Sequence, residues 1–157
     1  MSRFRFEKDR VAATLCLATG QTIHGFFFVA TSLSTHAGRE RVRDLLNATD
    51  GFFPFQRIDG ITTQYNRRHL VLVRLPDSVD EESREPGYEL AIRRAVVLTL
   101  STGTRINGTV AVYGPAGHER LSDYMNSAEH FRYVGTMDGT VIVNADHIVE
   151  VTERAES

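Results

Sequence analysis

The chain contains a single cysteine, Cys16, in 157 residues. One cysteine excludes a disulfide within the chain and a zinc site built from cysteine ligands. Neither sign of charge is in large excess, because 18 basic residues face 20 acidic ones and the net charge is −2. The protein as a whole therefore has no field that attracts nucleic acid or anionic lipid. Any such binding needs a local basic patch.

Long apolar stretches and catalytic motifs are also missing. No apolar run approaches the ~20 residues of a membrane helix, and charged residues interrupt the N-terminus between Arg3 and Arg10. We therefore expect a cytoplasmic protein with no membrane partner. The sequence has no Walker loop, no glycine-rich dinucleotide fingerprint and no paired-carboxylate signature, and its histidines lack the spacing of metal ligands. These absences predict a protein that is not an enzyme and that holds no metal and no cofactor.

The most informative feature is a stretch that the chain contains twice. Residues 37–47 have the sequence AGRERVRDLLN and residues 116–126 have the sequence AGHERLSDYMN, which align without a gap. Flanking segments repeat in the same order and pair 19–25 with 102–108, Asp59-Gly60 with Asp138-Gly139, and 66–71 with 144–149. Ordered self-similarity of this kind indicates an internal duplication of a unit of roughly 60 residues.

Each repeated unit combines strand patterns with one short helix. The aromatic and β-branched run at 22–30 predicts a strand. Gly25 lies inside this run and is matched by Gly108 in the second unit, which predicts a sharp bend at the same place in both. Apolar residues at i, i+3 and i+4 predict helices over 39–47 and 118–126.

The repeats predict a mainly β fold of two duplicated, strongly bent small β-barrel units, each with a short inserted helix. The first β-barrel repeat covers 11–74 and the second covers 91–152. Between them, residues 75–90 form an acidic linker whose carboxylates we expect to be solvated. The apolar edges of the two helices predict that Leu46 and Met125 are buried. The pattern leaves open whether the units close as two separate barrels or share one sheet.

Several short motifs resemble those of the Sm-like (LSm) family of small β-barrels. They are a bent strand with an internal glycine, an Asp shortly before an Asn, and a closing Asn-x-x-His strand at Asn66–His69 and at Asn144–His147. The Arg-Gly pair of the family signature is missing, and the helix lies within the second hairpin instead of at the N-terminus. The resemblance implies a tandem Sm-like duplication, ring-like oligomers, and RNA contacts from the Asp/Asn loop and the closing turn.

Four polar residue types stand at matching places in both copies of the repeated stretch. They are Glu40, Arg41, Asp44 and Asn47 in the first copy and Glu119, Arg120, Asp123 and Asn126 in the second. Exposed ion pairs on a helix contribute only ~0.3–0.5 kcal/mol each, so they do not explain why these residues occur twice. Two interpretations stay open. Either Arg41 packs its stem on the barrel while Asp44 holds backbone N–H groups, or the residues form a binding surface.

The sequence therefore leaves two functions open. The first is a non-enzymatic tandem Sm-like protein that binds RNA or single-stranded nucleic acid, supported by the resemblance and by basic runs in the first unit. The second is a self-assembling scaffold or protein-interaction module, in which the short helix and an edge strand form a homo-oligomer. The predicted nucleic-acid-binding residues are Arg39, Arg41, Arg43, Asp44, Asn47, Arg67, Arg68, Arg120, Asp123 and Asn126. The second unit keeps few of these arginines, so we expect the first unit to carry any such binding.

Overall fold

The computed structural model describes residues 8–31, 39–114 and 120–154, and it shows a mainly β protein. The first half contains β1 (Lys8–Leu17), β2 (Thr22–Ala30), α1 (Val42–Asn47), β3 (Phe52–Arg57), β4 (Thr62–Asn66) and β5 (Leu70–Arg74). The second half contains β6 (Ile92–Leu100), β7 (Arg105–Val112), α2 (Leu121–Met125), β8 (Phe131–Thr136), β9 (Gly139–Asn144) and β10 (Ile148–Glu153). The 3₁₀ turns are η1 (Arg67–His69) and η4 (Ala145–His147) before β5 and β10, and η2 (Glu82–Arg84) and η3 (Tyr88–Leu90) in the linker.

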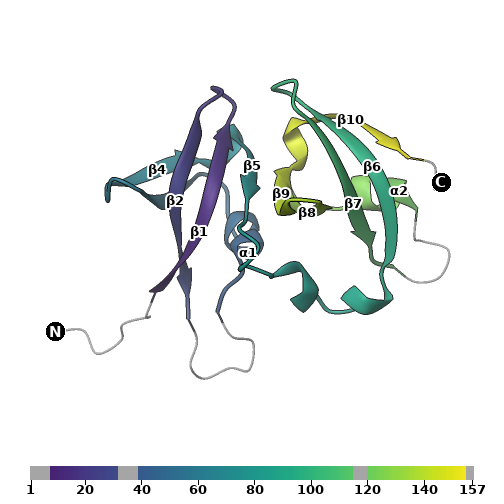
Figure 1. Cartoon of the computed structure of the whole chain (residues 1–157), viewed down its shortest axis with the longest axis horizontal. Helices are drawn as coiled ribbons and strands as arrows, with labels where there is room; N and C mark the ends of the chain where they lie inside the picture. The colour runs from purple at the N-terminus through teal and green to yellow at the C-terminus, as the bar shows by residue number, and fades with distance from the viewer. Residues whose placement is uncertain (1–7, 32–38, 115–119, 155–157) are drawn as a thin grey trace.

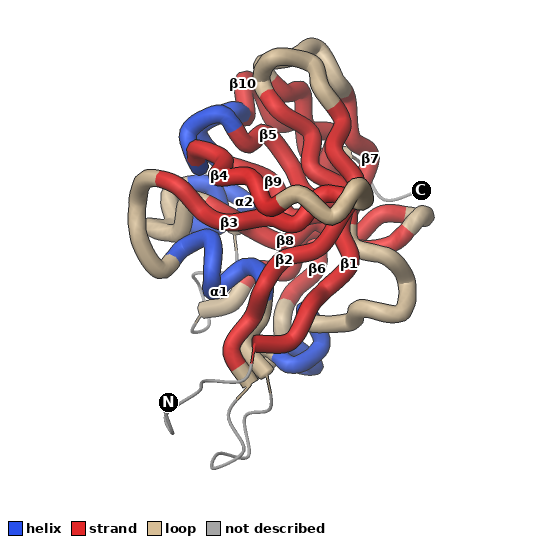
Figure 2. The backbone as a smooth tube through the Cα atoms, turned by 90° about the vertical axis from the view of Figure 1, so that its left-hand side faces the viewer, coloured by secondary structure: helices blue, strands red, loops and turns tan. Residues whose placement is uncertain are grey.

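The described strands form one antiparallel sheet with the order β10-β6-β7-β8-β9-β5-β1-β2-β3-β4. The two halves follow the same internal order, since β5-β1-β2-β3-β4 corresponds to β10-β6-β7-β8-β9. They lie side by side in Figure 1 and are joined through β5 and β9, with the linker running from β5 beneath the second half. Figure 2, which looks onto the first half, shows β2, β3 and β4 next to one another with β4 outermost.

The sheet is not closed into a barrel, so the prediction of two β-barrel units is wrong in this respect. β4 and β10 are its two ends, and no other described strand pairs with their outer sides. The physical reason lies in the partners of β5. This strand pairs with β1 on one side and with β9 of the other half on the other, which leaves it no free side for β4. Of the two arrangements left open by the sequence, the shared sheet is the one observed.

The last strand of each half, β5 or β10, pairs with the first strand of that half in the same register. On β1, Leu70 of β5 pairs with Leu17 and Leu72 with Cys16, so the register shifts by one residue between them. On β6, Ile148 of β10 pairs with Leu100 and Glu150 with Thr99, which is the same shift at the matching place. The repeated sequence therefore specifies strand irregularities as well as strand order.

Gly25 and Gly108 lie where one strand bends closely over the next, as their positions predict. A Cβ at Gly25 would overlap the carbonyl oxygen of Gln56, and a Cβ at Gly108 would lie 2.5 Å from Cγ1 of Val134. Only a residue without a side chain allows backbone to approach backbone at this distance. Because β2 bends at Gly25, it pairs with β1 along its length and with β3 only from Gly25 to Phe27.

Two apolar clusters form the core, and each draws residues from both halves. The first is built mainly from β1, β2, β3 and β5, and contains the stacked rings of Phe27 and Phe53 with the ring of Phe55 edge-on. It also includes Phe131, Tyr133 and Ile142 of the second half. The second cluster lies in the second half and includes Val71 and Leu72 of β5. The two clusters therefore meet across β5 and β9.

Both predicted helices are present but shorter than predicted, since α1 begins at Val42 and α2 at Leu121, and residues 118 and 119 lie outside the described residues. The two helices also differ in how they pack. α1 buries Val42 and Leu46, which confirms the prediction for Leu46. α2 buries none of its residues, so the prediction that Met125 is buried is wrong, and Met125 is half-exposed. Neither helix, nor any other in the described residues, is long and apolar enough to cross a membrane.

This difference predicts unequal costs for truncating the two helices. Leu46→Ala should lower the free energy of unfolding by ~2–5 kcal/mol, the usual range for a buried leucine that leaves a cavity. Met125→Ala should cost clearly less, because its side chain is already partly in water. Chemical denaturation of both variants measures the two values, and equal losses would contradict the packing described for α1 and α2.

Candidate functional site

The junction between the halves is a short run of strand pairing between apolar residues. Leu72 pairs with Val143, Val73 with Ile142, and Arg74 with Val141. The apolar members of these pairs are buried. The pairing therefore supplies main-chain hydrogen bonds and apolar contact at once, and it turns two open units into one continuous sheet.

A buried asparagine closes one end of this junction. The Nδ2 of Asn144 donates to the carbonyl oxygens of Arg67, at 3.3 Å, and of Leu70, at 2.9 Å. Its Oδ1 accepts from the backbone N–H of Asp146 at 3.0 Å. Because the side chain is buried and every one of its polar atoms has a partner, it fixes η1 of one half against η4 of the other.

A second asparagine, at the end of α1, holds the same end of the junction, because it bonds to Phe131, the strand partner of Asn144. The Nδ2 of Asn47 donates to the carbonyl of Phe131 at 2.9 Å, and its Oδ1 accepts from the N–H of the same residue at 2.9 Å. This two-way contact satisfies both backbone groups at the start of β8. The predicted site residue Asn47 therefore has a structural partner in the opposite half.

His147 adds a third polar link across the junction. Its Nε2 lies 2.7 Å from the carbonyl oxygen of Arg68, to which it donates, and its Nδ1 lies 2.6 Å from Oγ of Ser101. The bond to Ser101 lies within its own half. The bond to Arg68 shows that it also connects the halves.

A carboxylate of the linker caps α1 and ties it to the second half. Glu81 is buried and accepts hydrogen bonds from the N–H groups of Val42 and Arg43, both at 3.0 Å. It also accepts from the hydroxyl of Tyr133 at 2.8 Å. Burial and this neighbouring carboxylate raise the pKa of the Tyr133 hydroxyl well above its usual range. The expectation that the linker carboxylates are solvated is therefore wrong for Glu81.

The helix arginines of the predicted site form ion pairs with another linker carboxylate. Glu85 accepts from Arg41 at 2.6 Å and from Arg43 at 2.8 Å, and Asp44 accepts from Arg41 at 2.8 Å. The guanidinium of Arg43 is buried and lies 4.7 Å from the ring centre of Tyr133. A phosphate would have to compete with these carboxylates for both arginines.

The other predicted residues are dispersed. Arg67 is buried and donates to the carbonyls of Leu45, Leu46 and Phe52. Arg39 pairs with Asp9 at 3.1 Å, whereas the side chain of Arg68 is exposed. In α2, Asp123 accepts from the N–H of Arg120, and Asn126 donates to the carbonyl of Ser122. The structure therefore brings Arg41, Arg43 and Asp44 together and leaves the α2 set apart.

Sequence reasoning missed two residues that hold the junction, Glu81 and the side chain of Asn144. Asn144 is marked in the sequence because it is repeated as Asn66, but the motif that contains it predicts only a closing strand. Glu81 had none, because it lies among other acidic residues of the linker. Within the described ranges, no three His, Cys, Asp or Glu side chains gather closely enough to hold a metal ion.

Glu82, beside Glu81, makes the stability of the junction depend on pH. Burial raises the pKa of its carboxyl above the ordinary value of 4.5. Its contribution to stability is therefore complete below pH 4.5 and is lost as the pH rises through the folded-state pKa. Glu82→Gln should unfold at higher denaturant concentration than the wild type near neutral pH, and the difference should vanish in acid.

Denaturation curves at several pH values measure this effect, with Glu81→Gln as the matched control. Glu81→Gln replaces with an NH2 group one of the two oxygens that together accept from three donors, so it should destabilise the protein at neutral pH. A Glu82→Gln variant that is less stable than the wild type at neutral pH would contradict a carboxyl whose pKa is raised mainly by burial.

Comparisons of this chain with models of protein families, with curated proteins and with solved structures find no match. No family is therefore assigned to it, and the functional argument rests on the geometry of the junction and of the two ends of the sheet.

Proposed function

We propose that this chain is a non-enzymatic, self-assembling module of two Sm-like units, and that chains join head to tail through β10 and β4. The observation that carries the proposal is the junction of β5 with β9. In the repeated sequence, β9 corresponds to β4 and β5 corresponds to β10. The two strands that end the sheet, β4 and β10, are therefore the repeat counterparts of β9 and β5, which pair inside it.

The exposure of apolar residues at the two ends supports this proposal. Phe131 is 3% exposed at the junction, whereas its counterpart at the free end, Phe52, is 61% exposed. Val71 is 1% exposed, and its counterpart Val149 is 67% exposed. The same positions are thus buried where a partner half is present and open to water where it is not, as expected for surfaces that take a second partner.

The repeated asparagines support the same arrangement. Asn47 and Asn144 bond across the junction, and their copies Asn126 and Asn66 lie at the free ends. Between chains, Asn126 would reach the backbone of Phe52, and Asn66 would reach the carbonyls of Ala145 and Ile148. This gives a physical reason for two asparagine positions that the chain contains twice.

The side chains of the free edges are more polar than those of the junction. Glu150 stands where the junction has Leu72, and Gln64 stands where it has Ile142. Polar and charged residues on an edge strand limit indiscriminate pairing. The contact between chains should therefore be weaker than the junction and reversible. A head-to-tail contact of this kind gives a ring when its rotation closes and a filament when it does not.

Binding of RNA or single-stranded nucleic acid remains a prediction from the resemblance and the basic runs. Arg41, Arg43 and Arg67 already have carboxylate or carbonyl partners. The side chain of Arg68 is exposed, and one exposed arginine provides a single phosphate contact. The geometry therefore favours self-assembly over a nucleic-acid surface in the first half.

Cross-linking tests the proposed register directly. If the junction register repeats between chains, Thr152 of one chain lies opposite Thr63 of the next, as Arg74 lies opposite Val141. A Cys16→Ala chain carrying Thr152→Cys and Thr63→Cys should oxidise to a ladder of covalent multimers, because opposed Cβ atoms lie ~4.5–5.5 Å apart. Electrophoresis without reductant reads out the ladder.

The matched control moves one cysteine by a single residue. Thr152→Cys with Gln64→Cys places the two thiols on opposite faces of the sheet, because side chains alternate along a strand. This pair should remain mostly monomeric. A chain that gives no ladder with either pair, or equal ladders with both, would rule out the proposed register.

Asparagine variants separate assembly from folding. Asn126→Ala should weaken association of chains while leaving the unfolding of the single chain nearly unchanged, because its side chain is exposed. Asn47→Ala should lower the free energy of unfolding by ~1–3 kcal/mol, because it leaves backbone groups at the junction without partners. Light scattering measures association, and denaturation measures the free energy of unfolding. If neither variant associated more weakly than the wild type, the proposed asparagine contacts between chains would be contradicted.

A further inference from the structure

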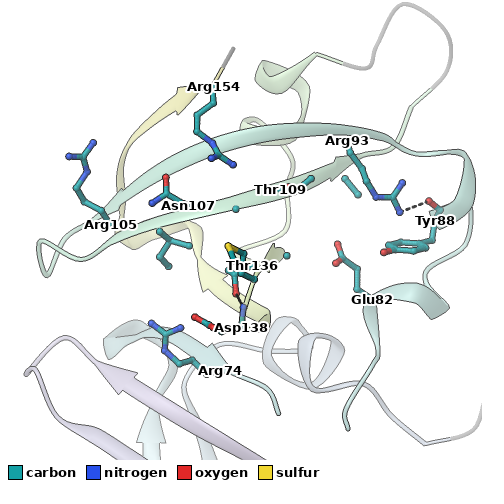
Figure 3. A pocket seen from close by; sticks show the side chains of 15 residues that line it. Arg74, Glu82, Tyr88, Arg93, Arg105, Asn107, Thr109, Thr136, Asp138 and Arg154 are labelled. Atoms are coloured by element: carbon teal, nitrogen blue, oxygen red, sulfur yellow. Dashed lines mark hydrogen bonds between the residues drawn. The ribbon is translucent and has the colours of Figure 1, made fainter. Parts of the chain in front are cut away.

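A groove lies between β7 and the turn that joins β8 to β9, with Arg74 of β5 in the first half on its opposite wall (Figure 3). Its volume is about 670 Å³, which is within the range of small-molecule sites. Arg105, Asn107 and Thr109 alternate along β7 and therefore point to this side together. Figure 3 shows Arg154 and Arg105 at one end of the groove, and Arg74 with Asp138 on the opposite wall.

The arginines of this groove differ from those at the junction. Arg41, Arg43 and Arg67 have carboxylate or carbonyl partners. In the described part of the chain, the side chains of Arg74, Arg105 and Arg154 make no hydrogen bond or ion pair. Three guanidinium groups that have no partner among the described residues thus line one groove of a protein whose net charge is −2.

The positive charge of the groove exceeds its negative charge. Four arginines line it, the fourth being Arg93, against two carboxylates, Glu82 and Asp138, which gives an excess of 4 − 2 = 2 positive charges. Glu82 and Arg93 lie together at one end, where Arg93 also covers the ring of Tyr88 at 4.4 Å. The end with Arg105 and Arg154 therefore carries most of the excess.

The corresponding face of the first half lacks these groups. The repeat matches Arg105 with Thr22, Asn107 with His24 and Thr109 with Phe26. The charge at the Arg105 end of the groove therefore occurs only in the second half, whereas Arg74 comes from β5 of the first half, and the architecture that both halves share does not require this charge. Guanidinium groups bind phosphate oxygens through paired N–H donors, and a groove with several of them suits more than one phosphate.

We infer that this groove binds a small molecule carrying two or three linked phosphate groups. The ligand is held by Arg74, Arg105 and Arg154, with Asn107 and Thr109 as polar contacts on β7. A strand of nucleic acid fits the groove less well, because such binding uses open aromatic faces for base stacking. The aromatic ring of the groove, Tyr88, is already covered by Arg93.

Calorimetric titration of the full chain with inorganic tripolyphosphate at low salt tests this site. Tripolyphosphate should bind, and the affinity should fall as salt is raised, because salt screens exposed charges. Arg105→Thr, which installs the residue of the first half, should weaken binding about tenfold or more, as expected for loss of a charged hydrogen bond. Arg68→Ala removes an exposed arginine outside the groove and should leave the affinity unchanged.

Two further ligands identify the source of the phosphates. A nucleoside triphosphate that binds as tightly as tripolyphosphate shows that the phosphates suffice, and one that binds more tightly shows that the groove also contacts the nucleoside. Both results support the site. Absence of tripolyphosphate binding at low salt, an equal loss in Arg68→Ala and Arg105→Thr, or binding of single-stranded RNA alone would overturn it. Thermal unfolding of each variant confirms that its fold is retained.

Discussion

Main-chain pairing of β5 with β9 is the contact on which the rest of the structure depends. Each half is only about 60 residues long, a size at which a core alone gives marginal stability. The pairing places Val71 and Leu72 of the first half in the core of the second, and Phe131, Tyr133 and Ile142 in the core of the first. Asn47, Asn144 and Glu81 then fix the halves in one register through buried or half-buried hydrogen bonds, and His147 adds an exposed one.

The same contact accounts for the asymmetry of the two ends. The first unit joins through its last strand in sequence, β5, and the second joins through its fourth strand, β9. The counterparts of these two strands, β10 and β4, are therefore left without a partner at the ends of the sheet. With them, Phe52 and Val149 stay exposed. The edges have diverged toward polar residues such as Gln64 and Glu150, while the asparagines have not. We infer that the contact between chains has the same geometry as the β5–β9 junction and is weaker than it.

Local order could be predicted from the sequence, whereas long-range pairing could not. The repeat located both short helices, and the glycines at 25 and 108 located the bends, because these features depend on residues close together in the chain. The pairing of β5 with β9 joins residues that are about 70 positions apart, and no local pattern encodes it. The role of Glu81 escaped for a related reason, since an acidic linker is usually solvated and only the folded arrangement brings Tyr133 and α1 to it. The predicted nucleic-acid-binding set combines arginines that lie close together in the sequence. In the folded protein, Arg67 and Arg43 have different partners.

The central claim is that the free ends of the sheet recognise each other, and sedimentation of the unaltered chain over a wide range of concentrations tests it most directly. A single chain has a mass of 17.6 kDa. The account predicts a weight-average mass that rises with concentration toward whole multiples of this value and falls again on dilution. A mass that stays at 17.6 kDa at every concentration would contradict it.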